Sequence, residues 1–350
     1  MNNIHTSPIN NTMPSISPIE FPSPSIGEAT SPLCDLCNTD VFSVARDATE
    51  ETGCILICEN CRLMYASPQL SPEALDCFYD DTFANDPGCQ LRAGTEFPTD
   101  KDREKEEILA ETWGIKIIKR FIEPRGKNIL DLRCRTGALT SILQQEGAKV
   151  IGVEPFQGNA NYARKARGLS NIIDLPFSRF HQFPSPHEDY FDIVNILPHH
   201  ILAHVLSPRR LLEQIFKAVK PGGYVFLDEK DVLHPIRHKK RSALDSGPAH
   251  QFHLTLQTTA RYFISIGFNL LEYELDKGRS SDFRHIRIVA QKPHTEKTIS
   301  TVPHQVTEGT GQSIGAIRRR LWWLEKFWCI RLAKIKYERK TQKLLKRFNS

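Results

Sequence analysis

Short apolar runs alternate with helical patterns along residues 127–293, and this alternation restricts the fold more than any other feature of the chain. The predicted strands are residues 128–132, 149–153, 171–173, 191–196 and 224–227, and the predicted helices are residues 138–146, 157–167 and 207–219. Strands separated by helices pair in parallel through right-handed crossovers. Nearly continuous apolar strands are covered on both faces. The sequence therefore predicts a doubly wound α/β sheet, in which ligands bind outside the carboxyl ends of the strands.

The last two predicted strands differ from the others. A predicted helix over residues 254–266 ends at Gly267, and two further β-rich runs follow at residues 268–275 and 285–289. The polar segment 276–282 between them has no room for a crossover helix. The sequence therefore predicts that these two runs pair as a terminal antiparallel hairpin.

Two C-x-x-C pairs precede this domain. Cys34 and Cys37 form the first pair, and Cys58 and Cys61 form the second, a spacing typical of zinc sites. Four thiolates leave no open coordination position, so the predicted zinc is structural and stabilises a small module over residues 31–83. The alternative is two unrelated pairs of small buried cysteines. The cysteines without ligand spacing are Cys54, Cys77, Cys89, Cys134 and Cys329.

A strand, a tight turn and a helix start follow one another over residues 128–139. Asp131 stands at the end of the strand, and Gly137 opens the helix. The next strand ends at Glu154, where a carboxylate can accept hydrogen bonds from the two ribose hydroxyls of an adenosine ligand. This turn is therefore predicted to hold an adenosine-bearing cofactor.

Together these features resemble the class I S-adenosylmethionine-dependent methyltransferases, and most of all the subgroup with an N-terminal zinc ribbon. The matching segments, in an order and spacing that are fairly specific, are residues 61–79, 129–137, 191–195, 204–208, 220–224 and 267–268. The resemblance covers roughly residues 32–293, and the terminal hairpin is also a hallmark of the family. It implies a Rossmann-like methyltransferase sheet, a small zinc ribbon and S-adenosylmethionine as the cofactor.

The resemblance also implies which positions contact the cofactor. In strand order they are Asp131 facing the methionine amino group, the backbone from Arg133 through Arg135 to Gly137 beneath the cofactor, Glu154 on the ribose, Asp174 on the adenine amine, and Asn195 with Ile196 on the pocket floor.

Three residues depart from the family pattern. Arg133 and Arg135 stand where the family has glycine, which adopts positive φ freely and lets the backbone approach a ligand. An arginine in that conformation is strained, and its side chain can fill the pocket. Ala203 replaces the glutamate of a usual Leu-Glu-His run, so a pocket carboxylate is missing. These departures oppose activity, whereas Asp131 and Glu154 support it.

Methyl transfer needs a positioned nucleophile and at most a base that removes its proton, and histidine is the obvious base near neutral pH. Five histidines lie on segments predicted to reach the active face, namely His199, His200, His204, His250 and His253. Any one of them taken alone is more often a surface or packing residue. As a group they favour His200 and His253 as candidate catalytic bases. His181 and His187 lie in a proline-rich loop and are predicted to be solvated.

The remaining segments are polar or basic. Residues 1–30 lack the basic start and apolar core of a signal peptide and are predicted to be a disordered tail. Residues 84–126 are predicted to be a linker and a helix, and residues 294–312 a polar linker. Residues 313–350 are predicted to form a basic amphipathic helix. This helix is predicted to contact a membrane surface, nucleic acid or an acidic protein, or to pack its aromatic side chains on the rest of the protein.

An odd count of nine cysteines without a secretion signal predicts a reducing compartment, by default the cytoplasm. The leading hypothesis is a methyltransferase that transfers a methyl group from S-adenosylmethionine to an unidentified acceptor, with a small molecule favoured. The alternative is a catalytically degenerate methyltransferase-like binding protein, whose zinc ribbon and basic helix contact a partner, nucleic acid or a membrane surface.

Overall fold

The computed structural model describes residues 33–48, 53–77, 100–183, 188–197, 200–235, 244, 250–276, 283–294, 313, 316–317 and 319. The predicted tail 1–30 and nearly all of the predicted linker 294–312 and helix 313–350 lie outside the described residues. No helix in the described part of the chain is both long enough and apolar enough to cross a bilayer.

A seven-stranded sheet with the order β10-β11-β8-β7-β4-β5-β6 forms the centre of the molecule. Its strands are β4 (Asn128–Leu132), β5 (Lys149–Glu154), β6 (Ile172–Asp174), β7 (Phe191–Ile196), β8 (Val219–Pro235), β10 (Asn269–Asp276) and β11 (Phe283–Gln291). Strands β4 to β8 pair in parallel, and β11 is antiparallel to both of its neighbours. The predicted doubly wound sheet with a terminal antiparallel hairpin is confirmed.

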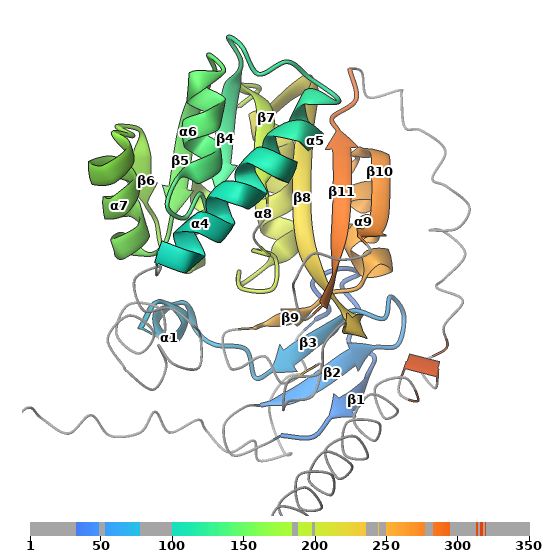
Figure 1. The fold of residues 1–350 in the computed structure, drawn as a ribbon. Coiled ribbons are helices and arrows are strands. Elements are labelled where there is room, and N and C mark those ends of the chain that lie inside the picture. Colours follow the sequence, from blue (N-terminus) through green and yellow to red (C-terminus); the bar gives the residue numbers. More distant parts are fainter. Residues whose placement is uncertain are drawn as a thin grey trace, which may run out of the picture.

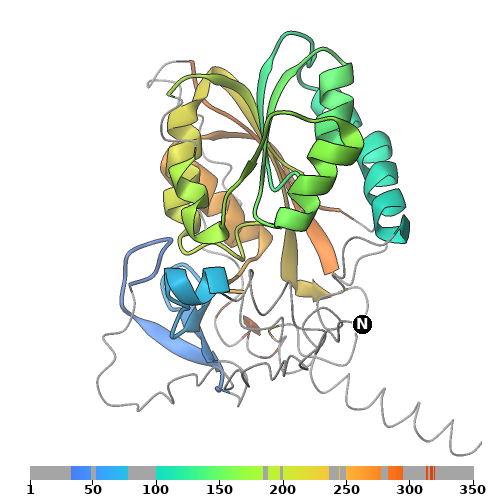
Figure 2. The same ribbon diagram turned by 90° about the vertical axis from the view of Figure 1, so that its left-hand side faces the viewer.

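Helices cover both faces of this sheet (Figure 2). One face carries α4 (Asp100–Leu109), a π-helical turn (Ala110–Gly114), α5 (Ile115–Lys119), α6 (Ala138–Gln145) and α7 (Gln157–Arg167). The other face carries α8 (Pro208–Ala218) and α9 (Leu256–Ile266). The nearly all-apolar strands are buried because side chains from these helices pack on both faces.

Local sequence signals begin and end these helices. The Ser207 side chain accepts a hydrogen bond from the Arg210 backbone N–H at the start of α8, which Pro208 opens. A capping box between Thr255 and Thr258 starts α9, and Gly267, with a φ of 112°, ends it. These capping residues explain why the predicted boundaries of α8 and α9 agree with the structure to within two residues. The prediction for β8 was too short, since this strand extends beyond residues 224–227 at both ends.

A second, four-stranded sheet has the order β1-β2-β3-β9. Its strands are β1 (Phe42–Arg46), β2 (Cys54–Cys58), β3 (Met64–Ser67) and β9 (Phe252–His253), and α1 (Pro72–Cys77) follows β3. Figure 1 shows this small sheet below the large one, at the end toward which β8 runs. The N-terminal module and the segment before α9 thus share one sheet, which lies beside the carboxyl ends of the parallel strands.

Candidate functional site

Asp131 and Asn195 meet at the carboxyl ends of β4 and β7. These two strands are neighbours although β5 and β6 intervene in the sequence, so this is the point where the strand order reverses. Asn195 Nδ2 donates to Asp131 Oδ1 at 2.7 Å, and Thr140 Oγ1 on α6 donates to Asp131 Oδ2 at 2.6 Å. The sheet therefore brings together two of the residues that the sequence assigned to the cofactor pocket.

Burial raises the pKa of Asp131 from its ordinary value of 3.8 to about 7. The hydrogen bonds from Thr140 and Asn195 oppose this shift, and the nearby Glu106 and Glu154 carboxylates reinforce it. Between about pH 4 and pH 7, Asp131 is therefore protonated in the folded chain and ionised in the unfolded chain. The contribution of Asp131 to stability is therefore full below about pH 4 and is lost as the pH rises through about 7.

We expect Asp131→Asn to gain stability relative to the unchanged protein as the pH rises from 4 to 8, by up to about 4 kcal/mol. The amide cannot ionise, so its burial carries no pH-dependent penalty. Urea denaturation of both proteins at several pH values measures the difference. A difference that stays constant with pH would contradict the raised pKa.

The turn between β4 and α6 has the backbone of a glycine-rich loop. Arg133, Arg135 and Gly137 adopt φ values of 59°, 51° and 78°, all in the left-handed region. A Cβ atom at Gly137 would lie 2.4 Å from Leu169 Cδ1, so the Leu169 side chain would have to shift, and the positive φ itself favours glycine there. The loop keeps its left-handed geometry although arginine replaces two of the glycines, at a cost of about 1–2 kcal/mol for each.

Glu154 is fully buried at the end of β5, and its carboxylate is surrounded by donors from the chain itself. Glu154 Oε2 accepts from the Arg135 backbone N–H at 2.9 Å, and Oε1 accepts from Asn159 Nδ2 at 3.0 Å and from the Phe156 N–H at 3.3 Å. Burial raises the pKa of Glu154, and the Arg133 charge is the largest opposing effect. Sequence reasoning did not identify Asn159, although its place in the first turn of α7 after this strand is typical of a ligand-facing position.

The Arg133 side chain crosses the ends of the central strands. Its Nη1 donates to the His200 carbonyl oxygen, beyond the end of β7, at 2.7 Å. Its guanidinium carbon lies 5.5 Å from the centre of the Phe177 ring, beyond the end of β6. Arg133 therefore spans the edge of the sheet where the family resemblance places the cofactor.

The other two charged positions of the predicted pocket form ion pairs. Arg135 Nε lies 3.7 Å from Glu106 Oε2, a buried carboxylate on α4 whose pKa burial raises. Asp174, at the end of β6, pairs with Arg164 on α7. The Arg135 side chain thus points toward α4, whereas Arg133 lies across the strand ends.

His200, His204 and His250 converge at the same edge of the large sheet. The ring centres of His204 and His250 are 4.4 Å apart, those of His200 and His204 are 5.0 Å apart, and those of His200 and His250 are 5.8 Å apart. His204 also stacks on Phe177 at 5.4 Å, the ring that Arg133 contacts. Burial holds the pKa of His200 well below its ordinary value, so its imidazole is neutral at neutral pH.

His253, the second candidate base, lies in β9, where it pairs with Met64 of β3. It is buried, and this burial together with the Arg46 charge lowers its pKa to about 3. The structure therefore places His253 in the small sheet and groups His200 with His204 and His250. The catalytic roles of His200 and His253 stay predictions.

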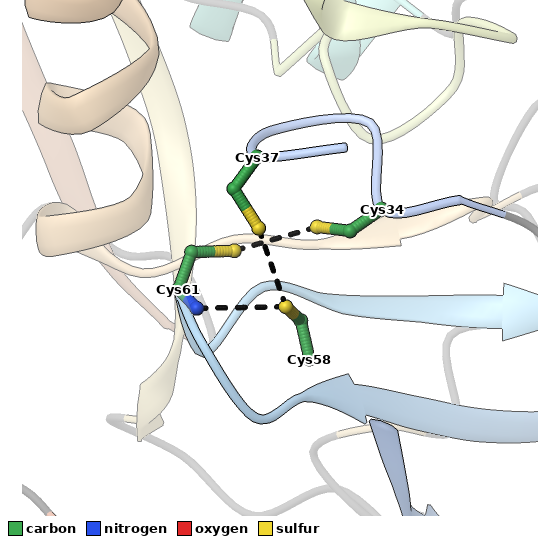
Figure 3. Close-up of side chains that lie close together, drawn as sticks. All are labelled: Cys34, Cys37, Cys58 and Cys61. Atoms are coloured by element: carbon green, nitrogen blue, oxygen red, sulfur yellow. Dashed lines mark hydrogen bonds between the residues drawn. The ribbon is translucent and has the colours of Figure 1, made fainter. Parts of the chain in front are cut away.

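The four predicted zinc ligands converge at one end of the small sheet (Figure 3). The sulfur atoms of Cys34 and Cys61 are 3.4 Å apart, and those of Cys37 and Cys58 are 3.5 Å apart. Four sulfur ligands at the usual Zn–S distance of about 2.3 Å would be roughly 3.8 Å from one another in a tetrahedron. The arrangement is thus compatible with a four-thiolate zinc site.

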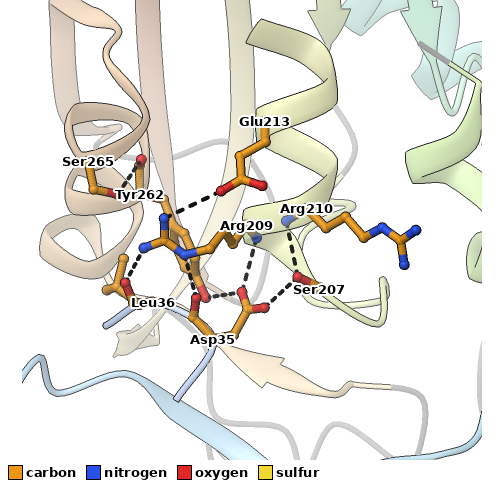
Figure 4. A network of polar contacts seen from close by, with 8 residues as sticks. All are labelled: Asp35, Leu36, Ser207, Arg209, Arg210, Glu213, Tyr262 and Ser265. Atoms are coloured by element: carbon orange, nitrogen blue, oxygen red, sulfur yellow. Dashed lines mark hydrogen bonds and ion pairs between the residues drawn. The ribbon is translucent and has the colours of Figure 1, made fainter. Parts of the chain in front are cut away.

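The first knuckle also contacts the start of α8 through Asp35, between Cys34 and Cys37 (Figure 4). The Asp35 carboxylate accepts hydrogen bonds from Ser207 Oγ, from the Arg209 backbone N–H at 3.0 Å and from the Tyr262 hydroxyl at 2.8 Å. The Arg209 side chain donates back to the Asp35 and Leu36 carbonyl oxygens. Because an anion is favoured at the N-terminus of a helix, this contact attaches the small module to the large domain.

We expect Asp35→Ala to lower the free energy of unfolding by about 2–4 kcal/mol, because three donors lose a charged acceptor. Urea denaturation measures this loss. Asp40→Ala, an exposed position in the same module, is the matched control and is expected to change stability by less than about 0.5 kcal/mol. Equal effects of the two substitutions would contradict the importance of this contact.

Residues 104–273 match the protein family described as "Methyltransferase domain". A ubiquinone biosynthesis O-methyltransferase of Hydrogenovibrio crunogenus is 31% identical over 113 residues, which cover 32% of this chain and 46% of that protein. An uncharacterized methyltransferase of Schizosaccharomyces pombe is 30% identical over 161 residues, covering 43% of this chain and 52% of that protein. The chain thus spans about half the length of these curated relatives.

Solved structures of methyltransferases are also similar to this chain. They include the 1,6-didemethyltoxoflavin-N1-methyltransferase of Burkholderia thailandensis, with 14% identity, a TM-score of 0.46, and coverage of 67% of this chain and 97% of that one. An S-adenosylmethionine-dependent methyltransferase of Mesorhizobium loti has 19% identity and a TM-score of 0.41 and covers 51% of this chain and 96% of that one.

The family match and the strand order of the large sheet lead to the same assignment. Residues 104–273 match a methyltransferase domain and contain most strands of the doubly wound sheet that the family resemblance implied. The match supports that resemblance for this part of the chain.

Proposed function

We propose that this protein transfers a methyl group from S-adenosylmethionine to a hydroxyl group of a small-molecule acceptor. The observation that carries the proposal is the methyltransferase domain match over residues 104–273. The hydroxyl acceptor is suggested by the relatives named ubiquinone biosynthesis O-methyltransferase.

The residues at the strand ends fit this cofactor in charge and in position. By position, Asp131 would face the methionine ammonium group, and Glu154 would accept hydrogen bonds from the ribose hydroxyls. The left-handed loop from Arg133 to Gly137 keeps the path of a cofactor-binding turn. The Arg133 side chain opposes the fit, because it lies across the strand ends and contacts the His200 carbonyl oxygen. Cofactor binding therefore requires this side chain to move.

Each part of the site has a distinct task in the proposed reaction. S-adenosylmethionine supplies an electrophilic methyl group on a sulfonium centre. Asp131 would hold the methionine moiety of the cofactor, and Glu154 would hold its ribose. The base that would accept the proton of the acceptor hydroxyl stays a prediction.

Isothermal titration calorimetry with S-adenosylhomocysteine tests the cofactor site. We expect Glu154→Gln to weaken binding at least tenfold, because the amide cannot accept hydrogen bonds from both ribose hydroxyls at the strand end. Asp192→Asn, at the opposite end of the large sheet, is the matched control and is expected to bind as tightly as the unchanged protein. No heat from the unchanged protein at millimolar ligand would overturn the proposed function.

The four-cysteine cluster supports a structural zinc ion as a further part of the proposal. Cys34, Cys58 and Cys61 are buried, and Cys37 is half-buried. Four thiolates fill a tetrahedral shell, so this zinc would have no position for a substrate. Its role would be to hold the two knuckles together and to present Asp35 to α8.

A second candidate function is favoured by one observation, the position of Arg133. A domain whose own side chain permanently fills the cofactor pocket would be a methyltransferase-like binding protein. The calorimetric experiment separates the two candidates, since only the enzyme binds S-adenosylhomocysteine.

A further inference from the structure

The three histidines at the edge of the large sheet come from two separate segments. His200 and His204 lie in the turn that follows β7, and His250 comes about 50 residues later, directly before β9. Backbone hydrogen bonds hold the two segments together, since the Gln251 N–H donates to the Ala203 carbonyl oxygen at 2.8 Å. Gln251 also accepts at its carbonyl oxygen from the Ala66 N–H at 2.9 Å, so the small sheet fixes the position of His250.

The ring nitrogens of this histidine trio are close enough to share one ion. One ligand nitrogen from each of His200, His204 and His250 lies within 4.8 Å of the other two. Nitrogens bound to zinc at about 2.1 Å in a tetrahedron lie roughly 3.4 Å apart, so modest ring rotations would close the trio around a metal. His204 is buried, whereas His200 and His250 are half-buried.

We propose that His200, His204 and His250 bind a divalent transition metal ion such as zinc, with a fourth position open to an anionic oxygen or nitrogen ligand. Imidazole is a preferred ligand of zinc and its neighbours among the transition metals. Sites with three protein ligands keep an open position, whereas four-thiolate sites do not. The trio is thus chemically different from the cysteine cluster of the same chain.

The charges around the trio favour an anion in that open position. The Arg133 guanidinium donates to the His200 carbonyl oxygen at 2.7 Å, and the Lys230 ammonium group also acts electrostatically on His200. These two cations repel a bare metal dication, and an anionic fourth ligand lowers that repulsion. The site accordingly matches a ligand with an ionised oxygen, such as a phenolate or a carboxylate, and its occupancy does not require the proposed methyltransferase activity.

Zinc analysis of the full-length, tag-free protein after saturation and removal of free metal tests the site. We expect about two zinc ions per chain in the unchanged protein, and about one in a His200→Ala/His250→Ala double variant. His181→Ala, a histidine outside the trio, is the matched control and is expected to retain both ions. One zinc ion in the unchanged protein, or two in the double variant, would overturn the proposal.

Cobalt substitution identifies which site is lost. Thiolate-to-cobalt charge-transfer bands in the near ultraviolet report the cysteine cluster, and visible d–d bands report both sites. We expect the double variant to keep the charge-transfer bands and to lose part of the d–d absorbance, which also shows that the cysteine module still folds. Loss of the charge-transfer bands together with unchanged d–d intensity per bound cobalt would contradict the assignment to the trio.

Azide, a small anionic ligand, tests the open position. We expect azide to shift the d–d bands of the cobalt-substituted unchanged protein and to leave those of the double variant unaltered. Unaltered bands in both proteins would overturn the open fourth position.

Discussion

Replacing Arg133 with glycine is expected to tighten S-adenosylhomocysteine binding by about 10- to 100-fold. The Arg133 guanidinium donates to the His200 carbonyl oxygen at 2.7 Å and lies over the Phe177 ring. A cofactor that occupies the strand ends must break this charged hydrogen bond, which is worth about 1.5–3 kcal/mol. Glycine removes that cost, and each 1.4 kcal/mol corresponds to about a tenfold change in affinity.

Arg133→Gly also relieves backbone strain. This effect has to be distinguished from the removal of the Arg133 side chain from the strand ends. Arg133 and Arg135 both adopt positive φ, but the Arg135 side chain points toward Glu106. Arg135→Gly is therefore the matched control. We expect both variants to gain about 1 kcal/mol of stability, and only Arg133→Gly to gain affinity in calorimetry.

Equal affinity of Arg133→Gly and the unchanged protein would show that Arg133 does not compete with the cofactor. An equal gain in both variants would assign the effect to the loop backbone. Binding by Arg133→Gly alone, with none by the unchanged protein, would favour the methyltransferase-like binding protein over the enzyme.

Replacing Cys58 with serine is expected to abolish zinc binding at the cysteine cluster and to destabilise the molecule by at least about 3 kcal/mol. Metal binding contributes directly to the folding of a module too small to have much core of its own. The loss of stability would extend beyond the small sheet, because Cys34, Cys58 and Cys61 belong to the same apolar core as residues of α8 and α9. For a chain of 350 residues the change corresponds to a fall in melting temperature of at least roughly 4 °C.

Cys54→Ser is the matched control, since Cys54 lies on the same strand and its thiol donates to the Ser67 carbonyl oxygen, away from the cluster. It is expected to keep its zinc and to change the melting temperature by less than about 1 °C. Differential scanning calorimetry with parallel metal analysis measures both variants. A Cys58→Ser protein as stable as Cys54→Ser would contradict a structural zinc.

The fold of the large domain was predictable because its signals are local. The apolar runs of the strands, the Ser207-Pro208 start of α8 and the Gly267 end of α9 each act within a few residues. The length of the loop before β11 excluded a crossover, so the antiparallel hairpin also followed from the sequence. β9 was not predicted, because a two-residue strand has no periodic pattern of its own and exists only through its pairing with β3.

The sequence predicted the positions of the two carboxylates of the candidate site, but it did not predict the contacts of the arginine side chains. Asp131 and Glu154 stand at strand ends, and parallel strands bring their carboxyl ends to one edge of the sheet. The sequence also indicated that arginine in the cofactor turn could fill the pocket. It did not indicate that Arg133 reaches the His200 carbonyl oxygen while Arg135 turns toward Glu106.

By itself the sequence determined the strand-helix alternation, the tight turn after β4 and the two cysteine knuckles, since each depends on residues close together in the chain. Only the tertiary structure decided that Asp35 contacts the start of α8 and that His250, and not His253, joins His200 and His204. These contacts join residues about 50 to 170 positions apart. They depend on the packing of the small sheet against the strand ends, which no local pattern encodes.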